Sequence, residues 1–130
     1  MRKTLLLLLC LASFVACQES MEERAERDAR ETTAKRCPLR MSDDGSLILE
    51  RIVFDKTTHT WRQNYLLDCD REVLIDEAVI RDALLKELRN TPSYKPYMDN
   101  GFNFQYIYCQ MKNPKDTLIN ITLTTKDYSD

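Results

Sequence analysis

The stretch from residue 102 to residue 125, FNFQYIYCQMKNPKDTLINITLTT, decides the fold that this sequence predicts. Two kinds of side chain alternate along both of its halves, as in β-strands, where neighbouring side chains point to opposite faces of the sheet. We therefore predict strands over 102–111 and 117–125, with a turn at 113–116 between them. One parity of the first strand is aromatic: Phe102, Phe104, Tyr106 and Tyr108. We expect this aromatic row to face the core, because burial of apolar area is favourable, which places Cys109 on the opposite face.

Two further strands and one helix precede this hairpin. Residues 47–54 and 60–69 are predicted strands, and the turn residues at 55–58 make them a second hairpin. Between the hairpins, residues 77–89 carry apolar side chains at the helical spacing i, i+4 and i+8: Ile80, Leu84 and Leu88. The order ββαββ predicts a small α+β domain over residues 37–130, with a four-stranded, mainly antiparallel sheet and one helix packed on one face.

The segment from residue 18 to residue 36, QESMEERAERDARETTAKR, differs from this domain in composition. Glu, Arg and Ala favour a helix, but the apolar side chains form no stripe broad enough to bury. We predict that residues 17–36 are a charged, partly helical tether exposed to solvent. The alternative is a coil that binds a partner through the thin seam of Met21, Ala25 and Ala29.

The first 17 residues resemble a targeting signal. Arg2 and Lys3 precede an apolar run, and a small residue, Ala16, stands directly before Cys17. The 13 residues from 4 to 16 span about 20 Å as a helix, whereas a bilayer core needs roughly 30 Å. The layout is similar to that of bacterial lipoprotein signal peptides. The resemblance implies that residues 1–16 are removed, that Cys17 is lipidated, and that the protein is anchored in the cell envelope.

Two further features of the sequence concern the cellular location of the protein. The acidic residues after Cys17 (Glu19, Glu22 and Glu23) loosely resemble surface-export signals of Bacteroidota lipoproteins, and Gln18 is not the aspartate of inner-membrane retention. The resemblance therefore implies an outer-membrane protein that faces the periplasm or the cell surface. Plain secretion after cleavage is the alternative.

The net charge and the cysteine spacing argue against a nucleic-acid-binding protein and against a CxxC metal site. The formal net charge is −2, which argues against a nucleic-acid partner. Beyond the leader, Cys37, Cys69 and Cys109 are an odd number, so the disulfide state stays open, and a Cys69–Cys109 bridge would turn the aromatic row outward. No cysteine pair has the CxxC spacing of a metal site, and we predict no cofactor.

Catalytic and metal-binding patterns are weak. His59 is the only histidine and falls in a predicted turn. Asp68, Asp70 and Glu72 could offer oxygen ligands to calcium, but they lack the glycine and the distal glutamate of a calcium loop. We interpret them as a polar connection.

The best candidate for a contact surface is the segment 94–100, in which Tyr94 and Tyr97 flank Pro96. Tyrosines on a stiffened loop are good recognition anchors, and Trp61 could join them. The alternative is that these rings cover the end of the core. We predict a non-catalytic envelope module that binds a protein, peptide or glycan, with a small enzyme or enzyme inhibitor as the alternative. Convergence of Asp68, Asp70, His59 and a thiol on one pocket would favour the enzyme, whereas a flat aromatic patch would favour binding.

Overall fold

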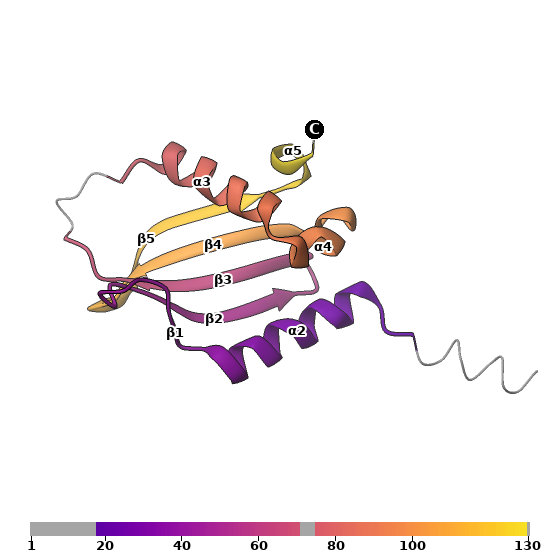
Figure 1. Ribbon diagram of the computed structural model, residues 1–130, viewed down its shortest axis with the longest axis horizontal. Helices are drawn as coiled ribbons and strands as arrows, with labels where there is room; N and C mark the ends of the chain where they lie inside the picture. The colour runs from indigo at the N-terminus through magenta and orange to yellow at the C-terminus, as the bar shows by residue number, and fades with distance from the viewer. Residues whose placement is uncertain (1–17, 71–74, 130) are drawn as a thin grey trace, which may run out of the picture.

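The computed structural model describes residues 18–70 and 75–129, which form a five-stranded sheet with helices packed over one face (Figure 1). The strands, in spatial order, are β1 (Leu39–Arg40), β2 (Leu47–Asp55), β3 (Thr60–Leu67), β4 (Asn103–Gln110) and β5 (Asn113–Leu123). The helices are α2 (Met21–Arg36), α3 (Glu77–Asn90), the short 3-10 helix η1 (Pro92–Tyr94), α4 (Lys95–Asp99) and α5 (Thr125–Tyr128). The predicted signal peptide, residues 1–16, and Cys17 lie outside the described residues. Within the described ranges, no helix is long and apolar enough to cross a membrane.

The sheet is mixed because β3 and β4 run parallel. The two predicted hairpins, β2–β3 and β4–β5, are antiparallel, and the short β1 pairs antiparallel with β2. α3 lies in the crossover between β3 and β4, which returns the chain to the starting end of β3 before β4 begins. The α+β class is confirmed, whereas the prediction of four mainly antiparallel strands with one helix matches only roughly.

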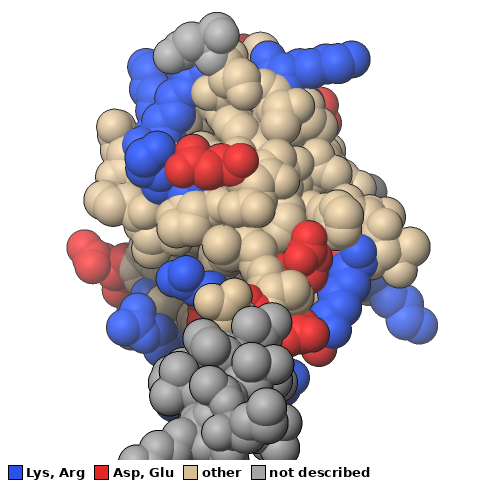
Figure 2. Space-filling model, turned by 90° about the vertical axis from the view of Figure 1, so that its right-hand side faces the viewer, with Lys and Arg blue, Asp and Glu red and all other residues tan. Residues whose placement is uncertain are grey.

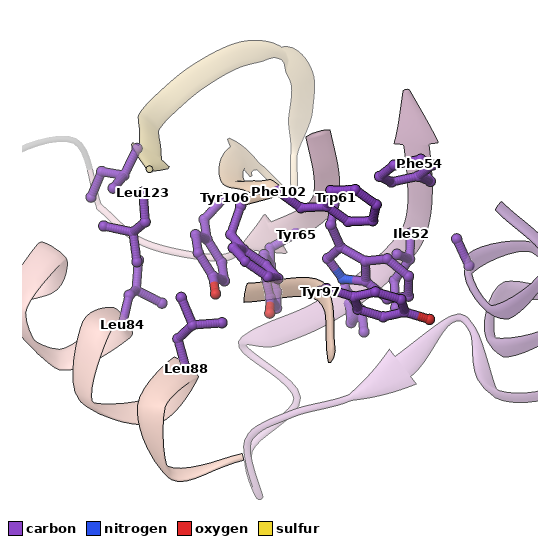
Figure 3. Packing of buried hydrophobic residues seen from close by; sticks show 14 of the residues in the cluster. Ile52, Phe54, Trp61, Tyr65, Leu84, Leu88, Tyr97, Phe102, Tyr106 and Leu123 are labelled. Atoms are coloured by element: carbon purple, nitrogen blue, oxygen red, sulfur yellow. The ribbon is translucent and has the colours of Figure 1, made fainter. Parts of the chain in front are cut away.

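α3 is the helix that the apolar spacing predicted. The Asp76 side chain caps its N-terminus by accepting hydrogen bonds from the backbone N–H groups of Ala78, at 3.0 Å, and Val79, at 3.4 Å. Leu84 and Leu88 are the buried residues of this helix and point at the sheet (Figure 3).

The core lies between the sheet and the helices, and the aromatic row faces it as predicted. Phe102, Phe104 and Tyr106 are at most 5% exposed. Tyr108 is partly buried and stacks on Tyr65 of β3 with ring centroids 4.6 Å apart. Cys109 consequently lies on the open face of the sheet. The three described cysteines, Cys37, Cys69 and Cys109, are all free thiols.

The prediction of a solvent-exposed tether is wrong for residues 21–36. α2 packs along β2 at one side of the sheet (Figure 1), with Ala25 and Ala29 0% and 1% exposed. The Thr33 hydroxyl donates to the carbonyl oxygen of Ile52, at 3.0 Å, and accepts from the Ile52 N–H, at 2.9 Å. These two bonds satisfy a backbone position on the outer edge of β2, which would otherwise be open to another strand. α2 therefore belongs to the folded unit.

Candidate binding groove

A groove of about 750 Å³ separates α2 from the segment formed by η1 and α4. We call it the α2–α4 groove. Its floor comprises Ile52, Trp61, Tyr94 and Tyr97. One wall is the polar face of α2: Arg24, Asp28, Glu31, Thr32, Lys35 and Arg36. The other wall comprises Pro92, Ser93 and Pro96. Protein sites for ligands occupy roughly 300–1,000 Å³, so this groove is large enough to hold one.

The floor brings together the three aromatic residues that the sequence singled out. Trp61 stacks on Tyr97 with ring centroids 5.3 Å apart, and Tyr94 meets Trp61 edge-on at 5.9 Å. Trp61 and Tyr97 are only 4% and 3% exposed, so both are also core residues (Figure 3). Tyr94 is partly buried. Tyr94 also packs edge-on against Phe104 of the core, with ring centroids 5.7 Å apart, so all three rings cover the core as well as line the groove.

The segment 94–100, interpreted from the sequence as a stiffened loop, instead lies mainly in α4 and begins at the end of η1, and two prolines mark the starts of these helices. Pro92 begins η1, and Pro96 lies at the start of α4. The fixed φ of proline suits a helix start, and its missing N–H is not needed there. Gly101, with φ +73°, then turns the chain so that the Phe102 N–H bonds to the Tyr97 carbonyl at 3.1 Å. This turn holds Tyr97 against the sheet.

A buried hydrogen-bonded chain ends at the groove floor. The Tyr65 hydroxyl donates to Gln63 Oε1, and Gln63 Nε2 donates to the Tyr94 hydroxyl at 2.9 Å. Gln63 is only 5% exposed. Burial raises the pKa of the Tyr94 hydroxyl above its usual value, although Gln63 and Trp61 oppose the shift, so the group stays protonated at neutral pH.

The Trp61 indole is the unusual member of the floor. Its Nε1 is buried, yet it has no hydrogen-bond partner among the described residues. It lies near the Tyr94 hydroxyl and affects its pKa without reaching hydrogen-bond geometry. Buried N–H groups are nearly always paired in folded proteins, so this one requires an explanation.

The α2 wall carries both signs of charge. Arg24 lies 3.8 Å from Asp28, and Asp28 also accepts a hydrogen bond from the Tyr97 hydroxyl. Burial and the nearby Asp28 carboxylate raise the pKa of Tyr97. At the other end of the wall, Lys35 and Arg36 are exposed, and neither forms an ion pair with another described residue. The groove thus has an end where the charges pair internally and an end where Lys35, Arg36 and also Glu31 form no ion pair with another described residue.

The residues named for catalysis or calcium do not converge. His59 lies in the β2–β3 turn, with Nε2 3.9 Å from Glu22 Oε1 and its ring stacked on Phe102. Asp68 and Asp70 follow the opposite end of β3, about 30 Å away at 3.3 Å per residue. Together with Cys69 they line a separate hollow. Glu72 lies outside the described residues, and the described ones contain no cluster of three or more metal-ligating side chains.

Sequence reasoning missed the α2 wall. Its residues recur at spacings of three and four, from Arg24 through Asp28 and Thr32 to Arg36, which is one face of a helix. This periodicity was visible in the sequence, but it is polar, and a polar stripe is normally assigned to solvent.

The fold and the groove define a class of protein: a small α+β domain in which helices cover one face of a mixed sheet and leave a groove beside an edge helix. The chain belongs to the family described as "Domain of unknown function (DUF8479)", whose model matches residues 20–119. This match includes α2. No curated protein matches the chain.

Three solved structures share the fold. The pilotin EpsS of the Vibrio vulnificus type 2 secretion system is 14% identical, with a TM-score of 0.66 over 84% of this chain and 92% of that one. A putative secreted protein from Pseudomonas aeruginosa is 9% identical, with a TM-score of 0.70 over 85% and 99%. The type II secretion pilotin AspS from Vibrio cholerae is 14% identical, with a TM-score of 0.60 over 82% and 90%. At such identities the likeness is one of fold.

Proposed function

We propose that the chain is a cell-envelope lipoprotein, anchored through Cys17, whose folded part binds a polypeptide of an envelope assembly in the α2–α4 groove. The observation that carries the proposal is the groove itself, an aromatic floor between a charged helix and a proline-stiffened segment. Aromatic anchors beside charged walls are typical of sites that bind protein segments. The likeness of fold to two type II secretion pilotins supports a partner within an envelope assembly.

A lipid on Cys17 would hold the groove close to the membrane. Ser20 caps α2 by accepting from the Glu23 N–H at 3.1 Å, and only residues 18–20 separate the helix from Cys17. Four residue steps reach about 14 Å at most. Figure 2 views the end of the molecule that lies on the right in Figure 1, and there both acidic and basic side chains lie around a largely uncharged surface. A mixed surface of this kind has little attraction for anionic lipids, which leaves acyl chains as the source of attachment.

The test is co-purification from the native envelope with a groove that has been filled. Thr32→Arg and Ser93→Arg place large side chains on the two walls without touching the buried floor. Thr57→Arg makes the same kind of change in the exposed β2–β3 turn and is the matched control. We expect a polypeptide that the wild type and the control recover and that the two groove variants lose. Equal recovery by all four proteins would refute the groove as the binding site.

A further inference from the structure

We propose that the outer edge of β5 binds an extended segment of another polypeptide, which pairs with β5 as an additional strand of the sheet. β5 is the last strand in the spatial order and lies at the edge away from α2 (Figure 1). We call residues 118–122 of this strand the β5 edge. The inference goes beyond the proposed function, because it assigns a second binding surface, separate from the α2–α4 groove.

The hydrogen-bond pattern of the sheet shows which backbone groups of β5 point outward. The N–H of Asn103, the first residue of β4, donates to the His59 carbonyl oxygen on the β3 side at 2.9 Å, so the odd-numbered residues of β4 bond to β3. Because successive residues of a strand bond to opposite sides, the even-numbered residues of β4 bond to β5, where their partners are odd-numbered. The residues of β5 whose N–H and C=O groups point away from the sheet are therefore Leu118, Asn120 and Thr122.

Most of these outward groups are available to a partner. Arg81 of α3 donates to the Thr122 carbonyl oxygen at 3.3 Å, so that acceptor is used within the chain. The outward N–H and C=O groups of Leu118 and Asn120 have no hydrogen-bond partner among the described residues. A row of donors and acceptors at the spacing of a strand is complementary to the backbone of another strand, which is the chemistry that specifies an extended polypeptide as the ligand.

Natural proteins usually protect the edges of their sheets, and this chain does so elsewhere. On the opposite edge, β1 has only two residues, and Thr33 of α2 bonds to Ile52. At the start of β5, Pro114 lacks an N–H and Lys115 carries a charge. Residues 117–123, TLINITL, contain no charge, proline or glycine and are rich in β-branched side chains. Such a segment on an open edge is suited to pairing with another strand.

The position of the proposed anchor favours a different polypeptide over a second copy of this chain. Two identical β5 edges pair symmetrically only when they run antiparallel. The start of α2 and the end of β5 lie at the same end of the sheet (Figure 1), so this pairing would put the two α2 starts at opposite ends of the joined sheet. With both copies anchored at Cys17, one membrane would hold them only with the strands lying along it. A segment of another chain has no such restriction, and this choice of ligand rests on the proposed anchor.

The experiment is selection from a library of 12-residue peptides displayed on phage, with the full chain purified in detergent as bait. Asn120→Ala and Asn120→Pro both remove the side-chain oxygen that accepts from Gln105 at 2.9 Å, but only proline also removes the outward N–H. Proline is tolerated in edge strands, and alanine is its matched control. We expect peptides rich in Val, Ile and Thr that bind Asn120→Ala within threefold of the wild type and Asn120→Pro at least 10-fold more weakly, as measured by calorimetry.

N-methylation of the selected peptides tests strand pairing without altering the protein, so it remains informative should Asn120→Pro fail to fold. In a strand paired with β5, every second N–H of the peptide points at the β5 edge. We expect methylation at positions of one parity to weaken binding to the wild type at least 10-fold and methylation at the other parity to leave it within threefold.

Several outcomes would overturn the inference: no peptide with these properties, equal binding to Asn120→Ala and Asn120→Pro, or equal losses on methylation at both parities. Wild-type dimers that Asn120→Pro separates in analytical ultracentrifugation would overturn the assignment to a different polypeptide. Thr32→Arg, which fills the α2–α4 groove, should bind the peptides as the wild type does, and loss of binding there would place them in the groove and overturn the inference too. None of these failures refutes the groove as the site of the proposed function, which co-purification tests separately.

Discussion

The replacement Thr33→Val tests whether α2 is held on the sheet edge as the structure has it. Valine has nearly the shape of threonine and a similar helix propensity, so the change removes the hydroxyl and little else. The hydroxyl makes two hydrogen bonds with Ile52, one as donor and one as acceptor. These bonds join residues 19 positions apart, so they report on tertiary docking and not on the helix alone.

The magnitude follows from the two bonds. Each is worth about 1 kcal/mol net, and their loss also leaves the Ile52 N–H and carbonyl oxygen unpaired beneath a packed helix. We therefore expect the free energy of unfolding to fall by about 2 kcal/mol. For a domain of this size, that corresponds to a melting temperature lower by roughly 8 °C.

The assay is urea denaturation followed by circular dichroism, with Thr32→Val as the matched control. Thr32 is the neighbouring threonine of α2, and its hydroxyl makes no comparable bond to the sheet among the described residues. We expect the control to change the free energy of unfolding by less than about 0.5 kcal/mol. A loss in Thr33→Val no greater than that of the control would refute the account of α2 as an edge cover.

Three further predictions concern the core, a turn and the anchor. Leu88→Ala, at a 1% exposed position, should lower the free energy of unfolding by about 3 kcal/mol in urea denaturation, whereas Val79→Ala, at a 64% exposed one, should be nearly neutral. Hydrogen bonds from the Ser46 hydroxyl, the Ser46 N–H and a second serine lower the pKa of Asp44 to about 2. Because that pKa lies below the unfolded value near 4, the stabilisation is present above pH 4 and should be lost as the pH falls towards 2, and pH-dependent denaturation of Asp44→Asn should lack this component. Cys17→Ser should abolish the lipid mass in the intact protein and move it from the membrane to the soluble fraction; an unchanged mass and fractionation would contradict lipidation.

The sequence predicted the strands, α3 and the inward aromatic row because their apolar side chains follow the periods of strand and helix. Ile119, Ile121 and Leu123 alternate strictly and are all buried. Such patterns depend only on local geometry, which one sequence contains in full. The order and direction of strands depend on where the chain returns after a crossover, and no period records that.

α2 escaped prediction for a different reason. Amphipathicity measures the breadth of an apolar face, and this helix buries mainly two alanines, Ala25 and Ala29. Small side chains allow the helix backbone to approach β2 closely, so a narrow seam suffices, and the Thr33 hydroxyl adds a polar contact that no hydropathy scale counts. The same helix supplies one wall of the groove, so the error about the tether concealed the candidate site as well.

The aromatic residues of the groove show how much of a binding site can be predicted from residue types alone. Tyr94, Tyr97 and Trp61 were singled out as binding anchors, and the structure does place them together. Two of them are buried core residues, so substitution by alanine would create a cavity as well as remove a contact, and lost binding in Tyr97→Ala could mean either.

Variants on the walls, and Tyr94→Phe on the floor, which removes a single hydroxyl group, separate these effects because they leave the packing of the sheet nearly intact. Recognition by this groove therefore has to be tested at the polar atoms of its aromatic rings and not at the rings themselves. The rings also hold α2, α4 and the sheet together: Tyr97 stacks on Trp61 and donates a hydrogen bond to Asp28 of α2.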